Sequence, residues 1–171
     1  MKPQVISSVI DYENPWFKVE KDTVKRPDGS VGFYYRVKKP NNFVIIVALK
    51  KNKAVLVRQY RNTIKNYTWE FPMGTIERKE KLEMAAKREF LEETGLEAES
   101  WTNLGEFLVA NGHTDQKAIC FLAQNIKQSN KKVKGEEGEI IDGVRMASLL
   151  ECKRYDTFST LEKMYECLKT G

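Results

Sequence analysis

The chain has 171 residues, of which 41% are hydrophobic and 11% aromatic, so it can bury a sizeable core and fits one domain better than two. Lysine and arginine exceed aspartate and glutamate by 29 − 24 = 5, which suits an anionic phosphate substrate, while the absence of a nucleic-acid motif disfavours nucleic acid as a partner. No apolar run reaches membrane length and no signal peptide is visible, so we expect a cytoplasmic protein without membrane partners. The cysteines include no Cys-x-x-Cys pair and indicate no disulfide framework.

The first half of the chain is predicted to be rich in strands. The strands expected from alternating or apolar runs are Trp16–Lys25, Val31–Val37, Phe43–Leu49, Ala54–Arg58 and Trp69–Phe71. The turn Arg26-Pro-Asp-Gly29 joins the first two strands into an antiparallel hairpin. Proline and glycine in Pro72-Met-Gly74 then mark the approach to a helix.

This helix is predicted to have two apolar lines and to end at Gly95, which has the place and identity of a helix C-cap. The first line consists of Leu82, Ala85 and Ala86. Glu89 and Glu93 continue this line, so their carboxylates should face the protein body. Met84 and Leu91 mark a second line on the opposite side, as in a helix held between two layers.

Three carboxylates are crowded on this helix. Glu89, Glu92 and Glu93 stand at positions i, i+3 and i+4, so they would repel one another without cations. Arg88 precedes Glu92 by four residues and is the natural partner of one carboxylate, which leaves the others for a metal. Oxygen ligands are the preference of Mg²⁺ or Mn²⁺ rather than Zn²⁺. A glutamate-rich helix that simply faces water is the alternative.

Further strands and a second helix are expected after Gly95. The strands are Leu104–Ala110, Ala118–Ala123 and one within Ile140–Met146, with a polar loop over Gln128–Gly138. Residues Thr157–Leu168 place their apolar side chains on one face and predict an amphipathic helix.

The spacing of one motif is specific. Gly74, Glu80, Arg88-Glu89, Glu92-Glu93 and Gly95 together resemble the Nudix box without a mismatch at its defining positions. The resemblance implies an α/β fold, a Nudix-type α/β/α sandwich around a mixed β-sheet, with an N-terminal antiparallel β-hairpin extension. It also implies hydrolysis of a nucleoside diphosphate linked to another group.

Roles follow from the Nudix resemblance position by position. Glu89 and Glu93 would bind the cation directly, and Glu92 would bind it directly or through water. The carbonyl of Gly74 would be a further ligand. Glu92 and Glu93 are the expected catalytic residues of the box. Many family members carry glycine just before the first glutamate, whereas this chain has Lys79 there.

Segments outside the box indicate a subgroup. The runs Val55–Arg61, Trp69–Gly74 and Glu13–Phe17 resemble the ADP-ribose and nucleoside diphosphate sugar pyrophosphatases. That resemblance implies N-terminal strands over residues 1–40 that form a homodimer, and a catalytic domain over residues 41–171.

The same resemblance suggests residues that bind the small-molecule nucleotide substrate. These residues are Arg58 and Arg61 for phosphate or ribose, Glu70 from the strand before the box, and Trp16 from the hairpin. Exposed salt bridges are the alternative for both arginines, and an ordinary strand carboxylate is the alternative for Glu70.

Two loops bear on substrate and catalysis. ADP-ribose pyrophosphatases tend to carry Ser-Pro-Gly and an acidic residue where this chain has Ala110–Gln116, so a nucleotide sugar or another diphosphate stays open. The only histidine, His113, lies in this run and is expected at a surface or substrate edge. In the later loop, the resemblance makes Glu137, ahead of Glu136 and Glu139, the candidate for orienting water, and a solvated loop is the alternative.

Two other functional classes stay open at this point. One is a binding or regulatory module with the same fold, and the other is a hydrolase of dinucleoside polyphosphates or RNA 5′ ends. Regulatory members usually lose box carboxylates, whereas this chain retains all of them, which favours an enzyme.

Overall fold

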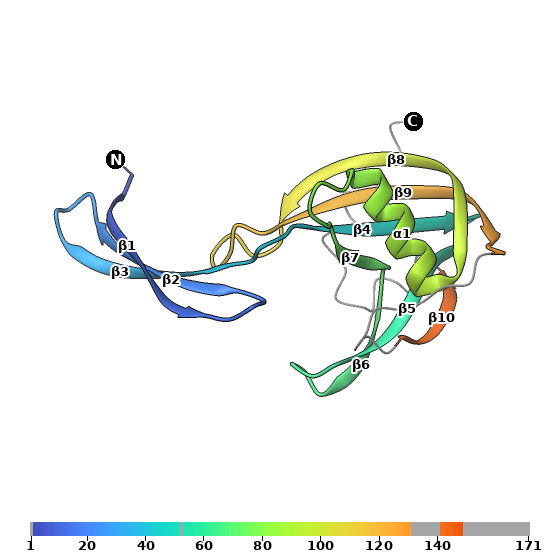
Figure 1. Ribbon diagram of the computed structural model, residues 1–171, viewed down its shortest axis with the longest axis horizontal. Coiled ribbons are helices and arrows are strands. Elements are labelled where there is room, and N and C mark those ends of the chain that lie inside the picture. Colours follow the sequence, from blue (N-terminus) through green and yellow to red (C-terminus); the bar gives the residue numbers. More distant parts are fainter. Residues whose placement is uncertain (1, 52, 131–140, 149–171) are drawn as a thin grey trace. The chain divides into compact units, whose positions relative to one another are not determined.

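The computed structural model describes residues 2–51, 53–130 and 141–148. Two compact units make up the fold (Figure 1). The N-terminal unit comprises Met1–Asn42 and Phe107–Ala118, and the second unit comprises Phe43–Glu106 and Ile119–Gly171. No helix among the described residues is long and apolar enough to cross a membrane.

The N-terminal unit is built on a three-stranded antiparallel sheet. Its strands are β1 (Gln4–Glu13), β2 (Lys18–Lys25) and β3 (Val31–Lys38), in the order β1-β2-β3. Strands β2 and β3 confirm the predicted hairpin, and Gly29 adopts a φ of 86° in its turn, a left-handed value that favours glycine. Strand β1 extends the hairpin to three strands.

This small sheet has an unusual distribution of polarity. Every residue of β1 is exposed, including Ile6 and Val9, and β3 exposes Phe33 and Tyr35. The most buried polar side chain is Asp22, which is 1% exposed. Apolar groups therefore face out while a carboxylate is buried, the reverse of an ordinary core.

The loop over residues 110–116 packs against β3. The hydroxyl of Tyr34 donates to the carbonyl of Gly112 at 2.7 Å, and the Val37 amide donates to the carbonyl of His113 at 2.7 Å. Lys38 forms an ion pair with Asp115, which lowers the pKa of that carboxyl through its hydrogen bond. The loop that departs from the ADP-ribose pattern is thus part of the N-terminal unit.

A seven-stranded sheet forms the centre of the second unit. Its strands are β4 (Phe43–Lys50), β5 (Lys53–Arg61), β6 (Asn66–Glu70), β7 (Met73–Thr75), β8 (Leu96–Leu108), β9 (Lys117–Gln128) and β10 (Ile141–Ser148). The main order is β10-β5-β4-β9-β8, with β6 paired to β5 and β7 to β4. Strands β4 and β9 run in the same direction in Figure 1, whereas β4 and β5 are antiparallel, which confirms a mixed sheet.

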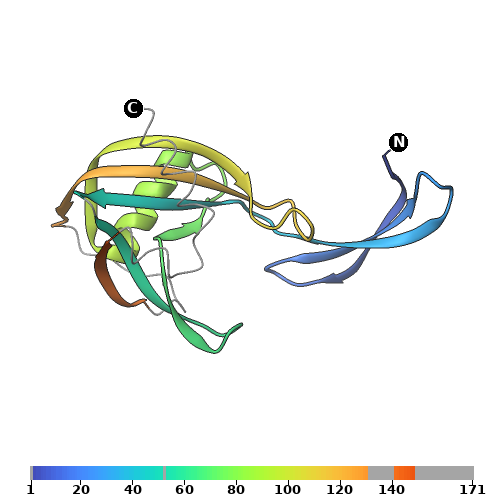
Figure 2. The ribbon, with the colours of Figure 1, turned by 180° about the vertical axis from the view of Figure 1, so that it is seen from behind.

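Helix α1 (Leu82–Thr94) covers one face of this sheet. The helix lies in front of the sheet in Figure 1 and behind it in Figure 2. Its buried residues Ala85, Ala86 and Phe90 share a core with alternate strand residues. These strand residues are Val44, Ile46, Ala48, Val55, Ile119, Phe121 and Ala123. Gly95 ends the helix in the left-handed conformation, as predicted.

The predicted helix faces are confirmed in part. Ala85 and Ala86 are fully buried, but Leu82 is 41% exposed because it lies in the first turn, beyond the strands that cover the alanines. The second apolar line is also less covered than expected, since Met84 is 55% exposed. The expectations that Leu82 is buried and that Met84 is held under a second layer are therefore wrong.

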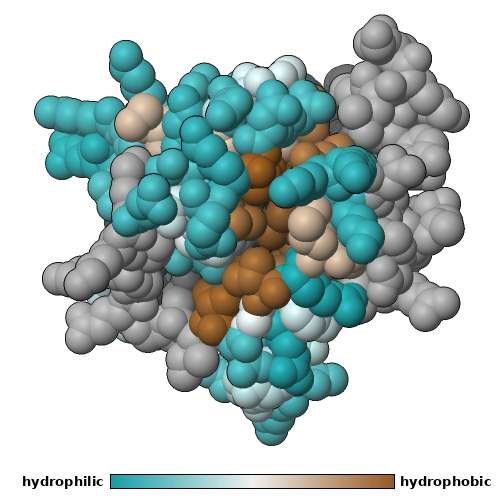
Figure 3. Space-filling model, turned by 90° about the vertical axis from the view of Figure 1, so that its right-hand side faces the viewer, coloured by the Kyte–Doolittle hydropathy of each residue, from teal (hydrophilic) through white to brown (hydrophobic). Residues whose placement is uncertain are grey.

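Strand β10, at one edge of the seven-stranded sheet, also exposes apolar side chains. In β10, Val144 and Met146 are 43% and 39% exposed. Figure 3 views the side of the molecule on which β10 lies and shows hydrophobic residues gathered in a patch with hydrophilic residues around it. The predicted helix over residues 157–168 lies outside the described residues, as does most of the polar loop over 128–138.

Candidate metal and catalytic site

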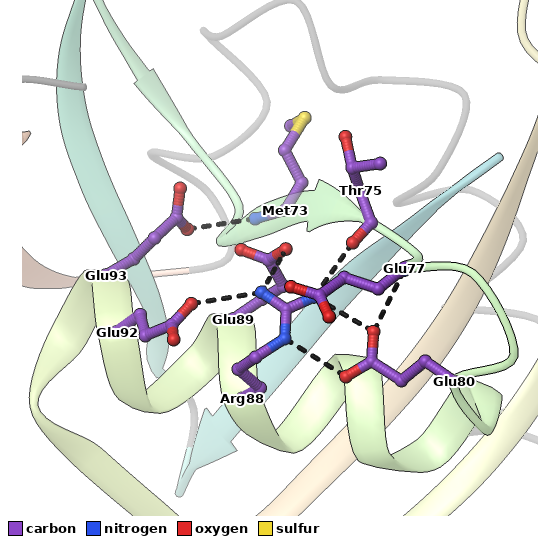
Figure 4. Close-up of polar contacts among 8 residues, drawn as sticks. All are labelled: Met73, Thr75, Glu77, Glu80, Arg88, Glu89, Glu92 and Glu93. Atoms are coloured by element: carbon purple, nitrogen blue, oxygen red, sulfur yellow. Dashed lines mark hydrogen bonds and ion pairs between the residues drawn. The ribbon is translucent and has the colours of Figure 1, made fainter. Parts of the chain in front are cut away.

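The site begins where α1 faces the short strand β7. Glu89 is 2% exposed, and its carboxyl group lies directly against the backbone of Gly74. Figure 4 shows the Glu89 side chain pointing from α1 toward the strand that carries Met73 and Thr75. A Cβ atom added at Gly74 would overlap that carboxyl group. Glycine is therefore required here for the close approach between the backbone and Glu89.

A backbone amide fixes the second buried carboxylate. The Met73 amide donates to Oε2 of Glu93 at 3.0 Å, and Glu93 is 7% exposed. Since β7 is itself paired to β4, the sheet sets the position of this amide. Both predicted inward-facing glutamates thus point toward β7, as the helical spacing predicted.

Arg88 connects the glutamates of the motif. Its Nη1 donates to Glu89 at 2.8 Å and to Glu92 at 3.0 Å, while Nε and Nη2 each donate to Glu80 at 3.0 Å. Nη2 also donates to the carbonyl of Thr75 at 2.9 Å. The predicted pair with Glu92 is confirmed, but Arg88 also bonds Glu89 and Glu80, which the sequence did not indicate.

These contacts shift the pKa values of the paired groups. The hydrogen bond from Arg88 holds the pKa of Glu80 below its usual range, and the bond to Glu80 raises the pKa of Arg88. Arg88 therefore stays charged at any pH that the protein tolerates. The Arg88–Glu80 pair is therefore charged on both sides.

The turn before α1 accommodates the departure at Lys79. The Glu80 amide donates to the carbonyl of Glu77 at 3.1 Å, and the Glu77 amide donates back to the Glu80 side chain at 3.0 Å. This turn gives Lys79 a φ of 68°, the left-handed region in which glycine is at ease. The turn geometry usual for glycine is thus retained, at a cost in backbone strain.

The donor set fits a hard divalent cation in chemical type. The predicted set consists of the carboxylates of Glu89, Glu92 and Glu93 and the carbonyl of Gly74, all of them oxygen donors. Within the described ranges, no three acidic, histidine or cysteine side chains already converge at coordinating distances. Arg88 instead bridges Glu89 and Glu92, so binding a cation requires these side chains to rearrange.

The substrate-binding candidates of β5 and β6 lie on opposite faces of the sheet. Val55 belongs to the core under α1, and side chains alternate along a strand, so Val57 and Arg61 share that face. Glu70 pairs with Val57 and thus lies on the same face. Arg58, three residues before Arg61, points to the other side.

Arg61 and Glu70 form a two-pronged ion pair. Nε of Arg61 donates to Oε1 of Glu70 at 3.0 Å, Nη2 donates to Oε2, and the Thr68 hydroxyl also donates to this carboxylate. Burial raises the pKa of Glu70, but the bonds from Arg61 and Thr68 outweigh it, so the pKa lies below the usual value. The pair keeps a charged guanidinium on the α1 face.

The remaining candidates belong to the N-terminal unit or lie outside the described residues. Trp16 is 72% exposed and belongs to the N-terminal unit. Glu136, Glu137 and Glu139 lie outside the described residues. Sequence reasoning missed the Met73 amide, because a backbone donor leaves no signal in residue type.

Comparison with known families identifies the chain. Residues 38–166 match the family model of the NUDIX domain, and residues 4–37 match the nucleoside diphosphate sugar hydrolase N-terminal domain. The chain belongs to the Nudix hydrolase family. Nudix hydrolases need a divalent metal ion, in keeping with the oxygen ligands on α1 and β7.

Individual relatives place this Nudix chain among enzymes and an activator. A methanol dehydrogenase activator of Bacillus methanolicus is 29% identical over 75% of this chain and 70% of its own length. An ADP-ribose pyrophosphatase of Bacillus subtilis is 28% identical over 71% of this chain and 65% of its own length. A crystal structure of an ADP compounds hydrolase superposes with a TM-score of 0.87 at 23% identity, covering 99% of this chain and 96% of that one. The latter likeness shows the fold.

Proposed function

We propose that this chain is a divalent-metal-dependent pyrophosphohydrolase of ADP-ribose or a nucleoside diphosphate sugar. It would cleave the diphosphate to a nucleoside monophosphate and a sugar phosphate. The observation that carries the proposal is the pair of buried carboxylates, Glu89 and Glu93, held against β7. The match of residues 4–37 to a nucleoside diphosphate sugar hydrolase domain supports this substrate class.

Mg²⁺ is the proposed ion, with Mn²⁺ as the substitute. Glu89 and Glu93 would hold it directly, Glu92 directly or through water, and the carbonyl of Gly74 would complete the protein ligands. When bound, such a cation neutralises diphosphate oxygens and makes an attacking water more acidic. The Met73 amide keeps Glu93 in place, and Arg88 orients Glu89 and Glu92.

Other residues would bind substrate and move the proton. Arg61 is the leading phosphate ligand because its side chain lies on the sheet face that α1 covers. Glu70 holds the guanidinium group of Arg61 in place there. Glu137 would orient or deprotonate the attacking water. Trp16 would contact the base, and the apolar surface of β1 and β3 would pair two copies into a cytoplasmic homodimer.

A regulatory module is the second candidate. The relative from Bacillus methanolicus is named an activator, which favours a protein that acts on a partner. Box carboxylates that are buried and fixed by Met73 and Arg88 favour catalysis, because a ligand sensor has no need of them. Hydrolysis of dinucleoside polyphosphates or RNA 5′ ends has no comparable support.

A substrate panel tests the proposal. The purified protein is assayed with Mg²⁺ on ADP-ribose, GDP-mannose, UDP-glucose, ADP-glucose and diadenosine polyphosphates, with released monophosphates measured by a coupled phosphatase. We expect turnover of at least one of the first four compounds. Turnover confined to diadenosine polyphosphates, or none with any compound, would reject it.

The role of Glu137 has its own test. In Glu137→Gln, kcat should fall with little change in KM, because the interaction matters mainly in the transition state. An unchanged kcat in Glu137→Gln, with a loss in Glu136→Gln or Glu139→Gln, would assign the role to a neighbour.

A further inference from the structure

A row of aromatic and arginine side chains crosses three strands on the sheet face opposite α1. This aromatic–arginine row consists of Arg58 and Tyr60 on β5, Tyr67 and Trp69 on β6, and Arg145 on β10. Arg58 pairs with Trp69, Tyr60 with Tyr67, and Arg145 with Leu56, so all five side chains point to one face. The carboxylates proposed as metal ligands are on α1, which covers the other face of the sheet.

Contacts within the row alternate between cation and ring. The Arg58 guanidinium lies 4.1 Å from the Tyr67 ring centroid, and the Arg145 guanidinium lies 4.4 Å from that of Trp69. Tyr60 and Tyr67 meet edge to face with centroids 5.3 Å apart. Each ring thus has a fixed orientation before any ligand arrives.

The outer members of the row are accessible. Tyr60 and Tyr67 are 42% and 44% exposed, and the Arg58 side chain is 40% exposed. Exposed aromatic rings beside guanidinium groups are the composition that stacks a nucleobase and binds its phosphate. An ordinary polar surface would not gather these residue types on adjacent strands.

The charge of the row favours an anion. The row carries two guanidinium groups, and that of Arg58 forms an ion pair with Asp142. Both partners of that pair are more than a third exposed, so the pair contributes little and a phosphate group can replace the carboxylate. Arg58 can then bind phosphate without leaving the Tyr67 ring.

We propose that the aromatic–arginine row binds a free nucleoside monophosphate, with the base on Tyr60 and Tyr67 and the phosphate on Arg58. The three strands span roughly 10 Å, which is room for one nucleotide and less than the run of four or more that single-stranded nucleic acids occupy. This site is separate from the α1 face and does not depend on the proposed hydrolysis.

Calorimetric titration of the full chain with AMP in EDTA tests the row. Tyr67→Leu and Arg58→Gln should each weaken binding at least about 10-fold, whereas Tyr67→Phe keeps the ring and should bind within about twofold of wild type. Asp142→Asn should tighten binding, because it releases Arg58. Lys87→Gln removes an exposed cation from α1 and is the control, which should leave the affinity unchanged. Arg61→Gln tests whether AMP, a product of the proposed hydrolysis, binds on the α1 face.

The contrary outcomes are distinct. No binding at millimolar AMP, or equal binding in wild type, Tyr67→Leu and Arg58→Gln with folding verified by circular dichroism, would reject the site. Loss of all binding in Arg61→Gln would place the nucleotide on the α1 face instead. Binding of oligoadenylate more than about 10-fold tighter than AMP, with the same dependence on Tyr67, would identify nucleic acid as the ligand and overturn the proposal.

Discussion

The two units bury acidic side chains in opposite settings. In the second unit, Glu89 and Glu93 on α1 lie beside an apolar core. In the N-terminal unit, Asp22 is buried in a sheet whose apolar residues face out. Ser8 donates to Asp22 at 2.5 Å, and Arg36 donates to it at 2.6 Å while also bonding Glu20.

The difference separates two uses of a buried charge. The Asp22 network joins two carboxylates to one guanidinium and a hydroxyl, and it links register partners across β1, β2 and β3. Around Arg88, one guanidinium contacts three carboxylates, and Glu93 lies on the same helix face. An acidic surplus beside a core is the arrangement that recruits cations, whereas exposed apolar strands are the arrangement that recruits a protein surface.

The largest expected effect comes from removing charge at the acidic surplus. Glu93→Gln should lower kcat by at least about 10²-fold while the protein stays folded, because the amide keeps the contact with Met73 but loses the ligand charge. Glu83→Gln, at an exposed position of the same helix, is the control and should keep its turnover. Near-normal turnover of soluble Glu93→Gln in saturating Mg²⁺ would remove Glu93 from the site.

A smaller loss should follow from filling the space at Gly74. Gly74→Ala forces the Glu89 carboxyl group away from β7, so metal affinity should fall on the order of 10- to 100-fold. Mn²⁺ binding measured by calorimetry checks this result. Gly112→Ala, where an added Cβ meets nothing, is the control. Equal Mn²⁺ affinity in Gly74→Ala and wild type would show that Glu89 does not bind the metal.

The exposed strands of the N-terminal sheet predict a change in assembly. Light scattering at micromolar concentration should give twice the chain mass of 19.8 kDa for the wild type. Ile6→Lys puts a charge on the exposed face of β1 and should weaken the dimer at least about 10-fold, while Glu83→Lys on α1 should not. A fully active wild type of monomer mass contradicts the account of this sheet.

The smallest effect concerns the strained turn of the motif. Lys79→Gly should raise the free energy of unfolding by roughly 0.5–1 kcal/mol, since glycine relieves the left-handed strain but is more flexible when unfolded. Urea unfolding measures the change. Lys87→Gly, within α1, should instead destabilise by about 1 kcal/mol. Destabilisation by Lys79→Gly would show that the lysine side chain itself holds the turn.

Local patterns in the sequence predicted much of the second unit. Helical spacing gave the buried side of α1, and alternating runs gave most strands, because both patterns depend on neighbours along the chain. Exposure of Leu82 and Met84 depends on which strands reach the helix, which the pattern does not contain. The packing of residues 110–116 on β3 is a contact between distant segments and had no local signal.

The candidate site was predictable in type and only partly in arrangement. The spacing of Glu89, Glu92 and Glu93 indicated a cation site, but the bonds from Arg88 to Glu80 and Glu89 depend on the turn before α1. The opposite orientation of Arg58 and Arg61 did have a signal, since residues three apart on a strand face opposite sides.

The central claim is that the carboxylates of α1 hold the divalent cation. A titration with Mn²⁺, in which electron paramagnetic resonance counts the free ion, measures this directly in wild type, Glu89→Gln and Glu93→Gln. We predict saturable binding in the wild type, weakened at least about 10-fold in both variants and unchanged in Glu83→Gln. Equal Mn²⁺ binding in all four folded proteins would contradict the claim.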